Sequence, residues 1–396
     1  MDNIRDCAIR TRDGRRLAFR ESGAADGWPV VALHGTPGAR NKYDVADRAA
    51  ARMGLRMISP DRWGYGDSER PRGALLSAYS HDLAALADHL GIDRFAVVGI
   101  SGGGPFAAAA ASCLGRRVAA LALIAPVGPF AGTRDPYAEG ACTLSGMSAF
   151  HAFCFRIAAR TPGAIRLAFL AYRLALSGAP HRAIGMAAAR AGRIDRETLA
   201  DPAVRDSLAS TFQLGLARGV GGPVLDLALF SRRWDFALSA IEAPTRIWVG
   251  TEDRNVPLPA VRGMAQLIPG CGLVEIRGLG TSGSRGTTRR FWPGSCECET
   301  GRSTPPRKAH PRKCRTPPSG RRSNHGCRVL LRSLWAALLG HSRRVTGARR
   351  SAQAVVALRD QPPNQSMKPP RTTMRGTCEA SAGCGALRQE SMGTVA

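Results

Sequence analysis

The chain has 396 residues and a formal net charge of +26, from 56 Lys and Arg residues against 30 Asp and Glu residues. The charge is uneven: residues 1–280 carry 34 basic and 25 acidic residues (+9), and residues 281–396 carry 22 and 5 (+17). The start of the chain is charged throughout, and no apolar run reaches the roughly 18 residues of a membrane span. We therefore expect a cytoplasmic protein whose apolar body buries a core and whose basic tail does not.

The first half of the body alternates between two patterns. Asp13-Gly14 separates two short runs and predicts an opening β-hairpin. Continuous apolar runs predict strands covered on both faces, at 29–33, 55–59, 94–98, 118–124 and 245–249. A further strand is expected at 272–276. Helical patterns such as 78–90 and 104–114 lie between the strands. Strands that alternate with helices predict an α/β fold with a mostly parallel, doubly wound sheet.

The alternation stops between residues 130 and 240, where patterns such as 150–159, 164–176 and 207–216 are helical. An insertion of this length is too long for a loop, so we expect a helical cap over the carboxyl edge of the sheet. Its apolar and aromatic residues are expected to pack rather than to bind substrate; they include Phe150, His151, Phe153 and Phe155. The predicted domains are a core at 1–129 and 241–280, a cap at 130–240 and a low-order tail at 281–396.

The strongest motif is Gly99-Ile100-Ser101-Gly102-Gly103, which has the form G-x-S-x-G between a predicted strand and a predicted helix. A plain glycine-rich turn is the alternative interpretation. The flanking strand and helix favour a sharp turn that exposes the hydroxyl of Ser101 as a nucleophile. The free N–H groups at the start of the helix favour negative charge developing at the same place.

Acyl transfer also needs hydrogen-bond donors for an oxyanion. The N–H of Gly102, which follows the nucleophile, is the first candidate. The second is expected in the loop His34-Gly35-Thr36-Pro37. Pro37 has no N–H to donate, so Thr36 is the better candidate, and we expect His34 to orient the loop rather than act as a base.

Four segments in this order, LHGTPGAR, SPDRWGYGDSERP, VVGISGGGP and WVGTEDRNVP, resemble the α/β-hydrolase family over residues of about 5–280. The resemblance implies a triad in the chain order Ser, Asp, His, with Ser101 as the nucleophile. Asp253 matches the position of the acid, and Glu252 is its local rival. Asp61 and Asp67 match positions that brace loops.

The resemblance also narrows the chemistry. Members of this family that open epoxides or displace halides carry aspartate where this chain has Ser101, and prolyl aminopeptidases typically show GGSWG. A small-molecule ester, lactone, thioester or amide is expected as substrate, and cleavage of an activated carbon–carbon bond stays open. No cofactor or metal is implied: the eleven cysteines lack paired metal-ligand spacing, and Cys296-x-Cys298 with His310 and Cys314 is too irregular for a zinc site.

The base of the triad is missing. The family pattern places histidine after the eighth strand as G-x-G-H, but here Gly278-Leu279-Gly280 is followed by Thr281. The chain has no histidine between His181 and His310. A threonine hydroxyl is no base near neutral pH, so we expect the activity of this chain to be impaired.

The composition changes at Thr281, where Arg, Ser, Thr, Pro and Cys replace the expected C-terminal helix. With GC-rich codons, a shift that starts at the last base of the Gly280 codon lets residues 281–293 read HLGLAGHDEEVLA. That peptide begins with histidine directly after G-L-G and continues into an acidic, helix-forming segment. Our hypothesis is that residues 281–396 are an out-of-frame extension, and the gene sequence around codon 280 tests it.

A second function class stays open. The +17 tail, with clusters such as Arg312-Lys313-Cys314-Arg315, is compatible with a non-catalytic binding protein that grips a nucleic acid or an acidic membrane surface. The tail has only three aromatic residues, Phe291, Trp292 and Trp335, and none is regularly spaced for base stacking. The serine hydrolase is therefore the preferred interpretation, and no specific nucleic-acid partner is expected.

Overall fold

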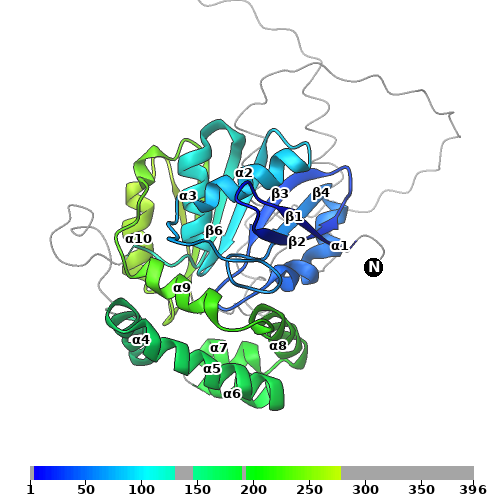
Figure 1. The fold of residues 1–396 in the computed structure, drawn as a ribbon. Coiled ribbons are helices and arrows are strands. Elements are labelled where there is room, and N and C mark those ends of the chain that lie inside the picture. The colour runs from blue at the N-terminus through cyan, green and yellow to red at the C-terminus, as the bar shows by residue number, and fades with distance from the viewer. Residues whose placement is uncertain (1–3, 130–145, 190–192, 278–396) are drawn as a thin grey trace, which may run out of the picture. The chain divides into compact units, whose positions relative to one another are not determined.

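One sheet organises the computed structural model, which describes residues 4–129, 146–189 and 193–277 (Figure 1). Within these residues the sheet has eight strands in the order β1-β2-β4-β3-β5-β6-β7-β8. Their bounds are β1 Arg5–Arg10, β2 Arg16–Gly23, β3 Trp28–Leu33, β4 Leu55–Pro60, β5 Phe95–Ile100, β6 Val118–Ile124, β7 Thr245–Gly250 and β8 Gly272–Ile276. β1 and β2 form the predicted antiparallel hairpin, β2 is antiparallel to β4, and all later pairs are parallel. The predicted α/β fold class is confirmed.

Helices connect the strands and fill the interval between β6 and β7. The core contains η1 Arg40–Ala46, α1 Asp47–Arg52, α2 Tyr79–His89, α3 Gly103–Leu114, η2 Gly115–Arg117, η4 Leu238–Ala240 and α10 Leu258–Leu267. The interval contains α4 Ala149–Arg160, α5 Pro162–Gly178, α6 Pro180–Ala189, α7 Arg193–Leu199, α8 Pro202–Leu216 and α9 Gly221–Phe230. The patterns above predict neither α1 nor α10, which are short at 6 and 10 residues.

The two faces of the sheet bury alternate residues of the same strands. In β3, Val31 and Leu33 belong to the larger apolar cluster with α2, α3 and α10, whereas Val30 and Ala32 belong to the cluster beneath α1. A strand that is buried on both faces needs apolar residues at successive positions. This explains why these strands appear in the sequence as continuous apolar runs and not as alternating apolar and polar residues.

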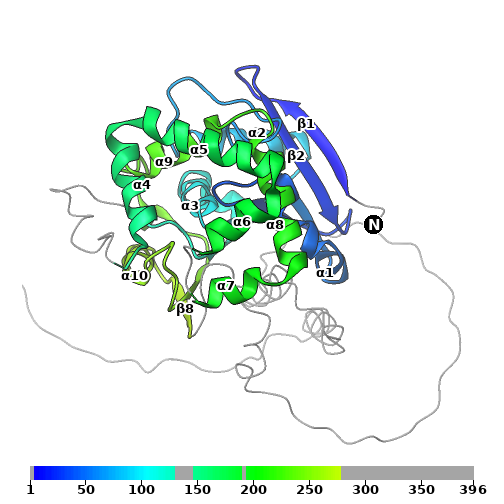
Figure 2. The ribbon, with the colours of Figure 1, turned by 90° about the horizontal axis from the view of Figure 1, so that it is seen from below.

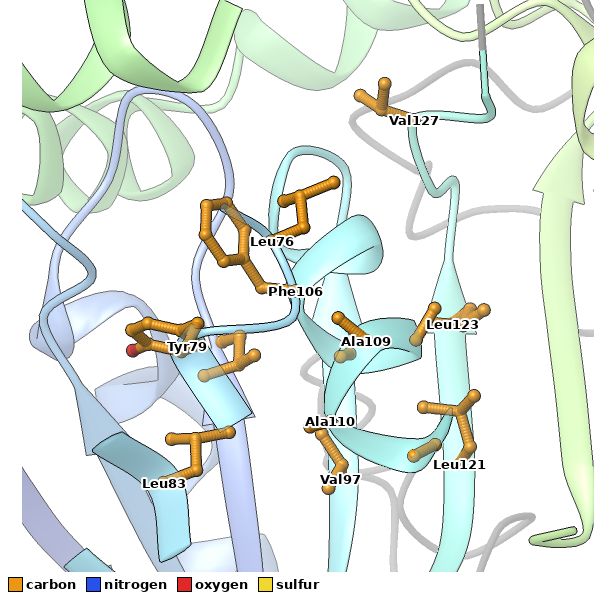
Figure 3. Packing of buried hydrophobic residues seen from close by; sticks show 14 of the residues in the cluster. Leu76, Tyr79, Leu83, Val97, Phe106, Ala109, Ala110, Leu121, Leu123 and Val127 are labelled. Carbon is orange, nitrogen blue, oxygen red and sulfur yellow. The ribbon is translucent and has the colours of Figure 1, made fainter. Parts of the chain in front are cut away.

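Aromatic rings fill the larger cluster near the start of α3. Phe106 is fully buried and makes edge-to-face contacts with Trp63, Tyr79 and Phe230. Figure 3 shows Phe106 and Tyr79 among the buried side chains around α3. Burial of one such side chain stabilises the fold by roughly 1.5–3 kcal/mol, and aromatic pairs add to it. The packing of Phe106 therefore fixes the first turn of α3, which follows Ser101.

The helices α4–α9 gather at one end of the sheet (Figures 1 and 2). The N–H of Gly66, after β4, donates to the carbonyl of Gly215 in α8, and that of Gly222 in α9 donates to Gly64. Near α4, the N–H of Ser148 donates to the carbonyl of Arg254, after β7. These helices therefore contact loops that leave the carboxyl ends of the strands. The extent of the predicted cap, 130–240, stays a prediction because 130–145 and 190–192 lie outside the described residues.

The described part of the chain contains no helix long and apolar enough to cross a membrane. The predicted tail, 281–396, lies outside the described residues, as do Thr281 and the cysteine and histidine residues considered as zinc ligands.

Candidate active site

Ser101 occupies the sharp turn between β5 and α3. Its φ is +50°, and it is one of two non-glycine residues with positive φ in the described chain, the other being Ala125. This left-handed conformation costs an ordinary residue about 1–3 kcal/mol and persists where the surroundings enforce it. Here the N–H of Ser101 donates to Ile124 O at 2.9 Å, and its carbonyl accepts from the N–H groups of Gly104 and Val127.

The flanking glycines allow close packing rather than unusual backbone angles. A Cβ at Gly99 would lie 2.6 Å from Gly103 O and 2.7 Å from the Ala107 side chain. A Cβ at Gly103 would lie 2.6 Å from His34 O. The motif is therefore glycine-rich because α3 starts directly against β5 and the loop after β3.

The loop after β3 lies beside Ser101. A Cβ at Gly35 would be 3.4 Å from the Cβ of Ser101, and a Cβ at Gly102 would overlap the hydroxyl of Thr36. No described residue accepts a hydrogen bond from the backbone N–H of Thr36 or from that of Gly102. The fold thus brings both predicted oxyanion donors next to the predicted nucleophile.

Asp253 lies in the loop after β7, two strands from β5. It is 6% exposed, whereas its neighbour Glu252 is exposed to solvent. Its Oδ1 accepts the N–H groups of Asn255 and Val256, each at 2.8 Å, which fixes the carboxylate within its loop. Parallel strands end at the same edge of a sheet, so Asp253 and Ser101 share that edge, and burial favours Asp253 over Glu252.

His34 is buried and uses both ring nitrogens. Nδ1 donates to Gly35 O at 2.8 Å, and Nε2 accepts the N–H of Arg62 at 3.0 Å. The two partners fix the proton on Nδ1, because a carbonyl only accepts and a backbone N–H only donates. Burial, followed by the charge of Arg62, lowers the pKa of His34 well below 6.5. His34 therefore orients the loop as a neutral ring and has no free nitrogen to act as a base.

We expect this buried ring to make the fold sensitive to mild acid. The unfolded imidazole takes up a proton as the pH falls below about 6.5, whereas the folded ring, with its lower pKa, does not. Stability from this group is fully present above pH 6.5 and falls by about 1 kcal/mol between pH 6.5 and 5.5. His151, whose pKa is also lowered by burial, acts in the same direction.

Nitrogen NMR of the imidazole rings separates the contribution of His34 from that of His151. The His34 signals, assigned by their loss in His34→Gln, should keep the pattern of a neutral Nδ1–H ring down to pH 6. A His34 signal that titrates with a midpoint near 6.5 would contradict the assignment.

A buried network not found by the sequence patterns supports the loop after β3. Arg62 and Asp226, both essentially inaccessible, form an ion pair with 2.6 Å between Nη1 and Oδ1. The hydroxyls of Thr36 and Tyr65 both donate to the other carboxylate oxygen, Oδ2. Two signals were present in the sequence: Arg62 and Tyr65 lie in the DRWGYGDS segment, and Asp226 is a lone acid in an apolar helix.

Charge and burial act oppositely in this network. Burial lowers the pKa of the Arg62 guanidinium, but the charge of the nearby Asp226 carboxylate raises it by more. The pKa of Arg62 therefore lies above its ordinary value. Burial, reinforced by the charge of Asp226, raises the pKa of Tyr65 well above 10. Arg62 therefore stays charged, and Tyr65 stays protonated as a donor.

Asp61 and Asp67 hold Arg40. Asp61 is fully buried and accepts the Arg40 N–H at 2.7 Å and its Nη1 at 2.5 Å. Asp67 accepts Arg40 Nη2 at 3.0 Å and Arg218 Nε, from beyond α8, at 2.8 Å. These contacts are of the kind expected for residues that brace loops.

Five histidines fall within the described residues. His81, His89 and His181 are exposed, and His34 is fully engaged as described. His151, in the first turn of α4, has Nδ1 2.7 Å from the hydroxyl of Ser148, whose N–H in turn contacts the loop of Asp253. The described residues contain no group of three or more His, Cys, Asp or Glu side chains able to hold a metal ion.

A mostly parallel sheet with an antiparallel opening hairpin, and a strained residue between strand and helix at its carboxyl edge, define the α/β-hydrolase class. A family model described as the alpha/beta hydrolase fold matches residues 29–278. The chain belongs to this family.

Individual relatives and solved structures resemble this chain over part of its length. A non-heme chloroperoxidase from Streptomyces lividans is 33% identical over 134 residues, which are 33% of this chain and 49% of the relative. The chain thus matches about half of that protein. An alpha/beta hydrolase fold protein from Nakamurella multipartita is 26% identical, with a TM-score of 0.50. The match covers 69% of this chain and 90% of that protein. An alpha/beta hydrolase fold protein from Chitinophaga pinensis is 16% identical, with a TM-score of 0.52. The match covers 70% of this chain and 91% of that protein, and it shows the shared fold.

Proposed function

We propose that this protein is a serine hydrolase that forms an acyl-enzyme on Ser101. Its substrates are small molecules with an ester, lactone, thioester or amide bond. The observation that carries the proposal is the left-handed backbone of Ser101 at the start of α3, with Thr36 and Gly102 beside it. The neighbouring pair of backbone N–H groups is what a tetrahedral oxyanion requires, so the site suits acyl transfer.

In the proposed reaction, Ser101 Oγ attacks the carbonyl carbon of the substrate, and the carbonyl oxygen becomes an oxyanion. The N–H groups of Thr36 and Gly102 stabilise that oxyanion. When the carbonyl re-forms, the bond to the leaving group breaks, and the acyl group stays on Ser101. Water then attacks the acyl-enzyme and releases a carboxylic acid.

Both steps need a base to take the proton of the hydroxyl or of the water. In the triad, Asp253 would hold the tautomer of that base and stabilise its charged form. The position expected for the histidine carries Thr281, which cannot accept the proton. We therefore propose that this chain is acylated slowly and turns over poorly, and that residues 281–396 derive from a shifted reading frame.

A single-turnover assay with p-nitrophenyl acetate tests the proposal. The chain should release about one equivalent of p-nitrophenolate slowly, followed by a still slower steady rate, because the acyl-enzyme lacks a base for deacylation. Release that persists unchanged in Ser101→Ala would refute the nucleophile. Brisk steady turnover that depends on Ser101 would instead show that a base is present. His151→Gln would then test whether His151, which is linked through Ser148 to the loop of Asp253, is that base.

A further inference from the structure

Asp226 connects helix α9 to the loop that carries Thr36. The residue is 1% exposed, and its side chain lies between two core loops. Oδ1 is 2.6 Å from Arg62 Nη1, and Oδ2 accepts the hydroxyls of Thr36 at 2.5 Å and Tyr65 at 2.6 Å. A buried carboxylate with this set of donors has few alternative positions, because losing any partner leaves charge uncompensated.

Arg62 holds the same loop from the other end of the network. Its Nε donates to His34 O at 3.1 Å, and its Nη2 donates to Gly35 O at 3.0 Å and to Thr36 Oγ1 at 3.1 Å. Gly35 O also accepts from the ring of His34. One planar guanidinium therefore fixes three consecutive residues of the loop.

These contacts determine where the Thr36 N–H points. The peptide unit between Gly35 and Thr36 is trans, so its C=O and its N–H point in opposite directions. With the Gly35 carbonyl turned to Arg62 and His34, the Thr36 N–H faces away from them. The Thr36 hydroxyl is engaged by Asp226 and Arg62, which leaves the backbone N–H as the donor of Thr36 that remains for a ligand.

The helices that carry Asp226 and its neighbours are pressed against these loops. A Cβ at Gly222, one turn before Asp226 in α9, would lie 2.6 Å from the ring of Tyr65. A Cβ at Gly215, in α8, would overlap the carbonyl of Gly38. The contact between α8, α9 and the core loops therefore leaves little room for the loop after β3 to shift on its own.

We propose that Asp226 and Arg62 are positioning residues that aim the Thr36 N–H at the oxyanion formed on Ser101. The proposal rests on the proposed function, since it assigns a role in the same acyl transfer. Neither residue touches the reacting atoms. Because Asp226 belongs to α9, one carboxylate sets both the seating of that helix on the core and the orientation of the oxyanion donor.

The test compares a p-nitrophenyl ester with its thionoester, whose C=S sulfur is a weak hydrogen-bond acceptor. In the full chain, Asp226→Asn should slow acylation of Ser101 by the ester about 100-fold. The thionoester gains little from the oxyanion donors and should be slowed much less. The ester-to-thionoester rate ratio should therefore fall with Asp226→Asn, which a general loss of packing would not produce.

Asp82→Asn is a matched control, because Asp82 is also a buried carboxylate paired with an arginine, Arg15, and with an aromatic N–H, that of Trp63. Its carboxylate bonds to Arg15 and Trp63 rather than to the loop after β3, so the ratio should stay unchanged. If Asp226→Asn does not fold, Thr36→Val removes the hydroxyl link while keeping the N–H, and should lower the ratio about tenfold.

The outcomes separate the two proposals. Acylation of Ser101 with an unchanged ratio in the folded variants would overturn the positioning role and leave the proposed function standing. No acylation of Ser101 in the unmodified chain would overturn the proposed function and the positioning role together. An equal fall of the ratio in Asp82→Asn would show a general structural effect and would also overturn the positioning role.

Discussion

Replacing residues 281–396 with the segment HLGLAGHDEEVLA is expected to raise steady turnover of an activated ester by about 10³-fold. The segment supplies a histidine directly after Gly280, four residues beyond β8, which runs parallel to β7 and ends at the carboxyl edge of the sheet. A base at this position can take the proton of Ser101 and later that of water, so both acylation and deacylation accelerate. The increase corresponds to about 4 kcal/mol of transition-state stabilisation.

The measurement is kcat and kcat/KM for a p-nitrophenyl ester. The matched control carries ALGLAGHDEEVLA, which differs only at the first residue and should keep the low rate. Equal turnover of the two chains would contradict the assignment of the missing base. Circular dichroism of both chains verifies that each keeps the helices and strands of the body.

Ser101→Ala in the restored chain is expected to lower kcat by roughly 10⁴- to 10⁶-fold, because the members of a triad act as a unit. The alanine keeps a small side chain in the turn and removes only the nucleophilic oxygen. Binding of substrate should change little, so the loss should fall on kcat rather than on KM.

Ser112→Ala provides the control for a serine of the same helix region. Ser112 lies in α3 and donates its hydroxyl to Ala237 O at 2.9 Å, away from the turn of Ser101. Its removal should leave kcat within a few-fold of the parent. Activity in Ser101→Ala above a tenth of the parent value would refute Ser101 as the nucleophile.

The fold and the position of Ser101 were predictable because both depend on local sequence. Buried parallel strands leave continuous apolar runs, and the turn at Ser101 needs glycines at fixed offsets where α3 meets β5. The strand and helix around the motif made the prediction specific. The choice of Asp253 over Glu252 depended on family resemblance, and its burial now gives a physical reason for it.

The network that supports the loop after β3 was not predictable in the same way. Arg62 and Asp226 are 164 residues apart, and no local pattern pairs them. The sequence offered Thr36 as a donor only because Pro37 lacks an N–H. That the Thr36 hydroxyl is engaged by Asp226, and that Arg62 holds the preceding carbonyls, depends on how α9 packs on the core.

The contrast in charge along the chain predicts that residues 281–396 are an out-of-frame extension. Residues 1–280 carry a formal charge of +9 and residues 281–396 carry +17, and the change occurs where the family pattern places histidine. The last described strand, β8, has no fully buried residue, unlike β7 beside it.

The proposed function requires that substrate acylate Ser101. Peptide mapping by mass spectrometry, after the unmodified chain is incubated with a p-nitrophenyl ester and quenched in acid, tests it directly. The acyl mass is expected on the peptide containing Ser101 and is expected to be absent from the same peptide of Ser101→Ala. An acyl group found only on other residues, or none on any peptide, would contradict it.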